Sequence, residues 1–127
     1  MTSTVGTDLI AGTPFEHSDE AAFVMDPHHS SILAANDAGC ALFGYTREEL
    51  LAIPISRIHP AEAADLVELL DRVLRDRRAS TIKLTCRTKH GTFLPTEISL
   101  HAFEIDGKTR ILGLVKDRSE HRHASRA

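Results

Sequence analysis

Residues 36–50 read NDAGCALFGYTREEL, and this stretch decides the fold. Asn36 is suited to cap a first short helix, because its side-chain oxygen can accept hydrogen bonds from the first free amides. Gly44 can end that helix in a left-handed conformation, and Thr46 with Glu49 has the capping-box spacing that starts a second helix. Helices this short are unstable alone in water, since nucleation is costly. Both must therefore pack against another part of the chain.

A hairpin precedes the two short helices, and a longer helix follows them. AAFVMD at 21–26, a turn at Pro27 and SILAAN at 31–36 read as strand, turn and strand. Pro60 stands where proline is favoured, at the first position of a helix that runs to Asp76. The apolar face of this helix repeats at three- and four-residue steps and comprises Ala63, Leu66, Val67, Leu70, Val73 and Leu74.

After the long helix, the sequence period changes to two, which is typical of strands. One strand carries Ile82, Leu84 and Cys86 on one side, with a turn after it at His90-Gly91. Alternation resumes over 92–104, Asp106-Gly107 is a strong hairpin signal, and 110–116 is a nearly continuous apolar strand suited to the middle of a sheet. The sequence therefore predicts an α+β fold: a five-stranded antiparallel sheet with short helices and one longer helix packed on one face.

Composition limits the classes of function. The 127 residues suffice for one domain with one core, and 42% apolar with 26% charged residues is ordinary for a folded protein. A net charge of −3 gives no electrostatic reason to expect nucleic acid or an anionic membrane as partner. No signal peptide or transmembrane run is seen, so we expect a cytoplasmic protein. Cys40 and Cys86 are expected to be reduced and buried.

Several phrases, in order and at matching spacing, resemble the PAS domain family of sensory modules. They are FGYTREEL at 43–50, IHP at 58–60, RTKHGTFLPTEIS at 87–99 and VKDRSE at 115–120. The resemblance covers roughly 18–122 and implies the PAS fold there. Residues 1–17 are then an N-terminal arm or cap, and 123–127 a C-terminal tail.

The resemblance implies a cavity between the curved sheet and its helices, filled either by side chains or by a small ligand. We expect a module that binds a small ligand or a partner and transmits a conformational signal. The output domain or partner would be a histidine kinase, a cyclase or a transcription regulator. Candidate ligand-binding residues, for each of which ordinary core packing is the alternative, are Phe43, Ile58, Leu66, Leu70, Leu84, Cys86, Glu97 and Val115.

Two alternatives remain open. A ligand-free module could dimerise or act as a scaffold, because domains that this chain resembles often pair as homodimers through the outer sheet face and the segment before the first strand. That segment includes Leu9, Ile10 and Phe15. A weaker alternative is a haem- or metal-dependent sensor with His59 as ligand. Either sheet face could be the inner one. Glu97 is expected in an ion pair with arginine or bound to a ligand if it faces the helices.

Specific chemistry finds little support in the motifs. The flavin-binding relatives carry a reactive cysteine in a phrase that corresponds here to 53–59, which has none. The long helix has no histidine for haem, and neither His28-His29 nor the 121/123 pair has the spacing of a structural zinc site. Hydrolase, metalloprotease, dinucleotide and P-loop motifs are absent. We therefore expect no haem, flavin or metal and no enzymatic activity.

Overall fold

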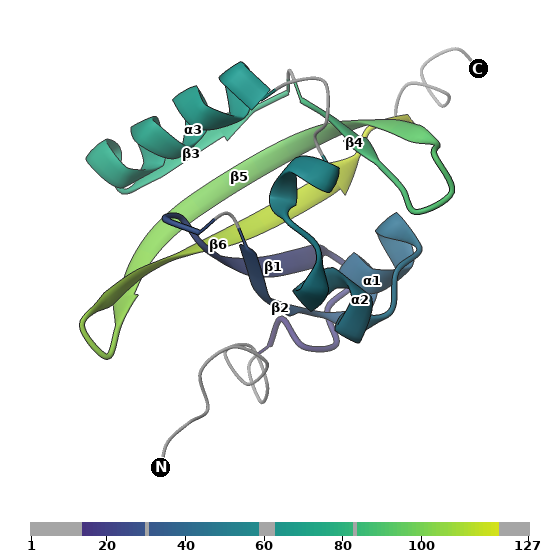
Figure 1. The fold of residues 1–127 in the computed structure, drawn as a ribbon, viewed down its shortest axis with the longest axis horizontal. Helices are drawn as coiled ribbons and strands as arrows, with labels where there is room; N and C mark the ends of the chain where they lie inside the picture. The colour runs from purple at the N-terminus through teal and green to yellow at the C-terminus, as the bar shows by residue number, and fades with distance from the viewer. Residues whose placement is uncertain (1–13, 30, 59–62, 83, 120–127) are drawn as a thin grey trace.

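The computed structural model describes residues 14–29, 31–58, 63–82 and 84–119. An antiparallel sheet in the order β2-β1-β6-β5-β3, with the short β4 also paired to β5, carries the helices on one face (Figure 1). The predicted α+β architecture is confirmed. In chain order the elements are β1 (Ala21–Asp26), β2 (Ser31–Ala35), α1 (Asp37–Phe43), α2 (Arg47–Ala52), the 3₁₀ turn η1 (Ile55–Arg57), α3 (Ala63–Asp76), β3 (Arg78–Thr81), β4 (Thr85–Arg87), β5 (Phe93–Ile105) and β6 (Lys108–Asp117).

The two short helices follow the cap chemistry of the sequence. Asn36 caps α1, Gly44 ends it with a φ of 78°, and both hydrogen bonds of the capping box between Thr46 and Glu49 are present at α2. α1 packs on β1 and α2 on β2, so the sheet provides the support that short helices lack in water.

The strand predicted after α3 is divided into β3 and β4. Thr81 pairs with Ile98 and Thr85 with Pro95, so three residues stand opposite two on β5. An extra residue of this kind reverses the facing of the side chains beyond it. The prediction that Ile82 lies on the same side of the strand as Leu84 and Cys86 is therefore wrong. Ile82 is 57% exposed, whereas the other two residues are buried.

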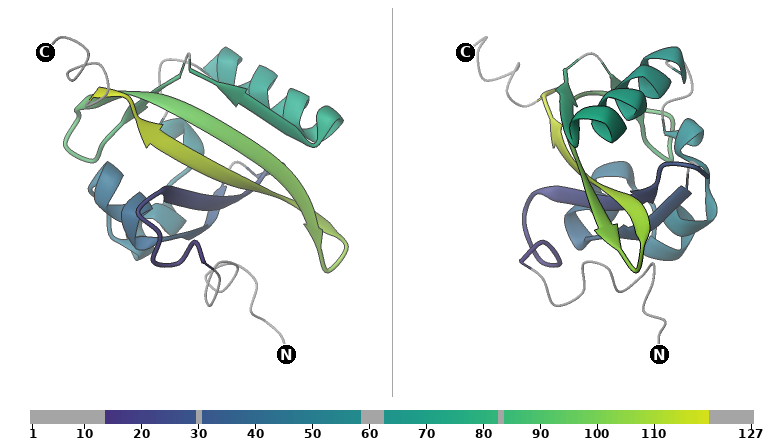
Figure 2. Two further views of the ribbon diagram at one scale, coloured as in Figure 1. Left: turned by 180° about the vertical axis from the view of Figure 1, so that it is seen from behind. Right: turned by 90° about the vertical axis from the view of Figure 1, so that its left-hand side faces the viewer.

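The apolar face predicted for α3 is also partly wrong. Leu69 and Val73 are its most buried side chains, while Val67 is 58% exposed. The helix lies over the edge strand β3 rather than over the middle of the sheet (Figures 1 and 2). Only a narrow apolar stripe of its surface therefore contacts the sheet. The predicted start at Pro60 lies outside the described residues.

β6 is the central strand, as predicted, and its register fixes which sheet face is inside. Gly113 pairs with Phe23 on one side and with Leu100 on the other, so these three residues share the face that the helices cover. Ile98 and Leu100 are buried there. The opposite face carries Leu112 and, half-buried, Glu97.

Asn36 joins three segments at the start of α1. Its side-chain oxygen accepts from Gly39 N at 2.8 Å and from Ala22 N at 2.9 Å. Its amide group donates to Glu20 O at 2.8 Å and to Phe15 O. The side chain is fully buried, and all its hydrogen-bonding capacity is used.

We expect Asn36→Ala to lower the free energy of unfolding by about 3 kcal/mol, because several buried backbone groups lose their partners. Urea denaturation measures the change. Thr46→Ala is the matched control, since it removes an exposed N-cap and should cost only about 1 kcal/mol. Equal losses in the two variants would contradict a central role for Asn36.

Candidate functional site

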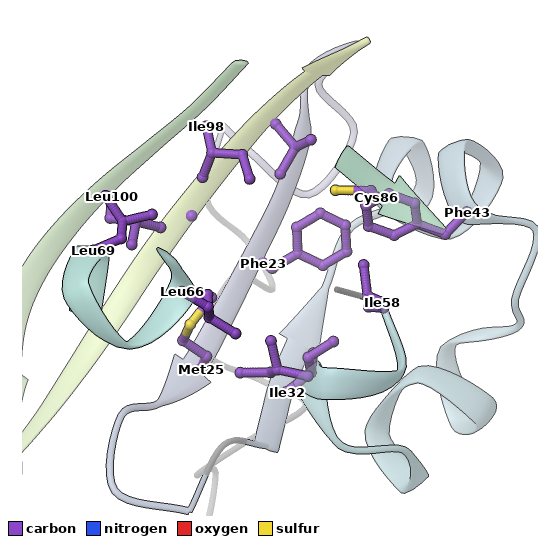
Figure 3. A pocket seen from close by; sticks show the side chains of 13 residues that line it. Phe23, Met25, Ile32, Phe43, Ile58, Leu66, Leu69, Cys86, Ile98 and Leu100 are labelled. Carbon is purple, nitrogen blue, oxygen red and sulfur yellow. The ribbon is translucent and has the colours of Figure 1, made fainter. Parts of the chain in front are cut away.

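A small cavity of about 40 Å³ lies between the helix-covered sheet face and the helices. Figure 3 shows the Phe23 ring in the middle of its lining, with Phe43 and Cys86 on one side and Leu69 and Leu100 on the other. No lining side chain carries a nitrogen or oxygen atom. The cavity is lined by Phe23, Met25, Ile32, Phe43, Ile55, Ile58, Leu66, Leu69, Cys86, Ile98, Leu100, Gly113 and Val115.

Phe23 and Phe43 hold the wall beside the short helices. Their rings stack with centroids 5.3 Å apart and an interplanar angle of 21°. Gly39 of α1 lies directly against Phe23: a Cβ atom there would come within 2.8 Å of the ring. The absence of a side chain at Gly39 therefore lets α1 approach β1 closely enough for the two rings to meet.

Gly113 lies in the floor of the cavity, where a side chain would be tightly packed. A Cβ atom at this position would lie 3.2 Å from Leu100 Cδ2 and 3.5 Å from Met25 Cε. Both contacts are with the ends of flexible side chains, which can shift by a few tenths of an ångström. A methyl group at this position would therefore fit only after a small shift of Leu100, and it would narrow the cavity at its floor.

Cys86 contributes the only sulfhydryl group in the lining, and it has a hydrogen-bonding neighbour. Its Sγ lies 3.6 Å from Thr96 Oγ1, which in turn donates to Leu84 O at 2.8 Å. Cys40 lies outside the lining, and burial raises the pKa of its thiol, the direction expected for a structural cysteine.

The eight predicted site residues divide into two groups. Leu70 packs half-buried against the core and Leu84 is buried, but neither lines the cavity, and Glu97 lies on the opposite face of the sheet. The lining residues Phe23, Leu100 and Gly113 were missed, because the sequence left the inner sheet face undecided. Those predicted residues that do line the cavity are Phe43, Ile58, Leu66, Cys86 and Val115.

Glu97 does not take the role proposed for an inward-facing carboxylate. It stands opposite Lys116 in the β5–β6 register and is partly exposed. The part of the chain that the structure describes contains no ion pair of Glu97. Water can therefore solvate this carboxylate, and no buried partner is needed.

The β4–β5 hairpin connects the cavity wall with the end of β6. Arg87 N donates to Ile58 O at 2.7 Å, and Lys89 N donates to Phe43 O at 2.9 Å. Arg118 N, just beyond β6, donates to Pro95 O at 2.8 Å. Two residues of the cavity wall and the segment that leaves the sheet are thus bonded to one hairpin.

Between 14 and 119, leaving out the undescribed positions, no group of three or more His, Cys, Asp or Glu side chains is placed to hold a metal ion. None of the described helices has both the length and the apolar composition needed to cross a membrane. His59, the candidate haem ligand, lies outside the described residues.

The chain is an α+β domain with an apolar cavity between its sheet and its helices, and comparison with known proteins identifies the family. Residues 19–120 match the model of the PAS domain, so the chain belongs to the PAS domain family. A methyl sulfide methyltransferase-associated sensor of Methanosarcina acetivorans is 24% identical over 112 residues. That match covers 88% of this chain but only 11% of the relative.

Solved structures agree. A domain of the sensory box sensor histidine kinase/response regulator from Geobacter sulfurreducens is 31% identical, with a TM-score of 0.68 over 81% of this chain and 87% of that one. The PAS domain of a protein from Colwellia psychrerythraea has a TM-score of 0.75 at 18% identity, covering 84% and 92% of the two chains. The second likeness shows the fold alone.

We expect alanine to be much more damaging at Gly39 than at Gly113. Gly39→Ala should destabilise the protein by about 1–3 kcal/mol despite the better helix propensity of alanine, because its Cβ atom meets a stacked ring. Gly113→Ala should change the free energy of unfolding by less than about 1 kcal/mol, because its Cβ atom meets only the flexible ends of Leu100 and Met25, which can shift slightly. Urea denaturation compares the two variants; a greater loss for Gly113→Ala would show that these two side chains cannot shift.

Proposed function

We propose that this chain is a sensory or regulatory module that binds a small apolar ligand in the cavity and passes a change of packing to an output domain or partner protein. Its membership of the PAS family and the similarity to a sensor and to a sensor kinase domain support signal transduction. The observation that carries the proposal is a wholly apolar cavity between the sheet and the helices, with Phe43 of α1, Ile55 of η1 and Leu69 of α3 on its helical side. Its cytoplasmic location stays a prediction from the sequence.

The volume and lining of the cavity limit the class of ligand. Drug-sized ligands occupy pockets of roughly 300–1,000 Å³. About 40 Å³ suits a far smaller molecule, and the apolar walls offer water no hydrogen-bonding partner. We therefore propose an uncharged molecule of a few heavy atoms, or a gas, and neither haem nor flavin.

Transmission would follow the hairpin that contacts the cavity wall. A ligand that displaces Phe43 or Ile58 strains the hydrogen bonds of their carbonyl groups to β4 and to the turn after it. The strand β5 carries that displacement to Pro95, which holds Arg118 at the exit from the sheet. The output would be a kinase, cyclase or transcription regulator attached beyond this point.

Xenon is a suitable probe, because it binds dry apolar cavities of this kind. In methyl-selective NMR spectra, xenon should shift the signals of Ile98, Leu100 and Val115 in a saturable manner. Gly113→Ala is the control that narrows the cavity at its floor, and it should reduce these shifts several-fold. Unchanged spectra, or equal shifts in the variant, would refute the ligand site.

A second candidate function, dimerisation or scaffolding as a homodimer, is favoured by an apolar patch on the outer sheet face. Val24 and Ala34 are buried there by their half-buried neighbours. Their register across β2, β1 and β6 places Ala34, Val24 and Leu112 in one row. The half-buried members are Leu33, Phe103 and Leu112.

We expect Leu112→Lys to weaken self-association at least tenfold if this face pairs two chains, because a charge would be buried in the interface. Sedimentation velocity at several concentrations measures it. Val67→Lys is the matched control, since it adds the same charge at an exposed apolar position on α3. Identical association in both variants, or a monomer at all concentrations, would exclude dimerisation through this face.

A further inference from the structure

A second pocket is lined by residues from the β1–β2 turn and from the β5–β6 hairpin. It has a volume of about 360 Å³ and shares no lining residue with the apolar cavity. Unlike that cavity it is polar. Its lining comprises Asp26, His28, His29, Gly107, Lys108, Thr109 and Arg110.

Arg110 is the buried cation of this pocket. The residue is only 7% exposed, yet its contacts are long: Nη1 lies 3.5 Å from Asp26 Oδ2 and donates to Thr109 O at 3.3 Å. Its Nε is buried and has no hydrogen-bond partner among the residues that the structure describes. A buried guanidinium with an unmet donor is costly, so a further acceptor near it would stabilise the protein.

Asp26 neutralises Arg110 only in part, because three groups share its carboxylate. His29 Nδ1 lies 2.8 Å from Oδ2, and the backbone amide of His28 donates to Oδ1 at 2.9 Å. Burial acts to raise the pKa of Asp26, but these hydrogen bonds and the charge of Arg110 lower it overall. The carboxylate therefore stays ionised, and its shortest contacts are with the two histidines rather than with Arg110.

The other charged residues of the β5–β6 hairpin leave the lining of the pocket with a net positive charge. Lys108 precedes Arg110 by two residues on β6, so the two side chains share one face of the sheet. Glu104 is engaged by Arg77 Nη2 at 2.7 Å and by Thr109 Oγ1, and Asp106, in the exposed turn, is not in the lining. The lining thus holds two permanent cations against one carboxylate, with two imidazoles beside them.

We propose that this pocket binds a small oxyanion, the phosphate or carboxylate group of a metabolite, between Lys108 and Arg110. The buried guanidinium forms the base of the site, and the exposed Lys108, His28 and His29 form its walls. Charge-assisted hydrogen bonds of this kind are the strongest that side chains make with oxyanions. The site is independent of the apolar cavity, which lies on the other face of the sheet.

Titration of the whole chain with inorganic phosphate and, separately, with acetate tests the proposal by ¹H–¹⁵N NMR at constant ionic strength. Saturable shifts should appear at 107–110 and at His28 and His29. Stronger binding of phosphate assigns the site to phosphate groups, and stronger binding of acetate assigns it to carboxylates. Shifts that sodium chloride reproduces at equal ionic strength would overturn the proposal.

Substitution of Lys108 distinguishes binding in this pocket from a general attraction of anions to basic side chains. Lys108→Gln should weaken binding at least fivefold, and Lys108 is exposed, so the fold is retained. Lys116→Gln, on the same strand but outside the pocket, should change affinity less than twofold. Equal effects of the two variants would overturn the proposal. Gly113→Ala should leave anion binding unchanged, whatever its effect in the xenon experiment.

Discussion

The buried side chain of Asn36 is the contact on which the arrangement of the helices depends. Its four hydrogen bonds join the segment before β1, the strand β1 and the first turn of α1. Because the side chain is fully buried, its hydrogen bonds with Ala22 N and Gly39 N are shielded from water, and these two amides have no alternative partner there. The orientation of α1 on β1 follows from this, and with it the approach of Gly39 to Phe23 and the stack that closes one wall of the cavity.

Features that depend on a few adjacent residues were predictable. The caps at Asn36 and Thr46 and the left-handed Gly44 are local chemistry, and so is the Asp106-Gly107 turn, whose φ values of 53° and 75° suit a tight hairpin. The division into β3 and β4 was not predictable, because the extra residue exists only relative to β5. Which side of α3 is buried likewise depends on the position of the helix over the edge of the sheet. The spacing of apolar residues within the helix does not reveal that position.

The sequence likewise predicts only part of the lining of the apolar cavity. Cys86 and Val115 follow from strand alternation and family resemblance, and both line the cavity. Phe23, Leu100 and Gly113 were missed, since the choice of inner face is made by the helices rather than by the strands. Gly113 carries no side chain, so its effect on the cavity is visible only against Leu100 and Met25. The pocket around Arg110 depends on the meeting of two turns distant in sequence.

The two proposed sites share the strand β6, and this sharing has a thermodynamic consequence. Arg110 faces the polar pocket and its neighbour Ile111 is fully buried in the apolar core, because successive side chains of a strand point to opposite faces. If either ligand shifts β6, it alters the affinity for the other by a factor that must be equal in both directions. The central strand is paired with β5 along its whole length and with β1 over 111–115, so it resists such a shift, whereas the short helices do not. The response to a ligand in the cavity should therefore be concentrated in the helices and the β4–β5 hairpin, with weak coupling to the anion.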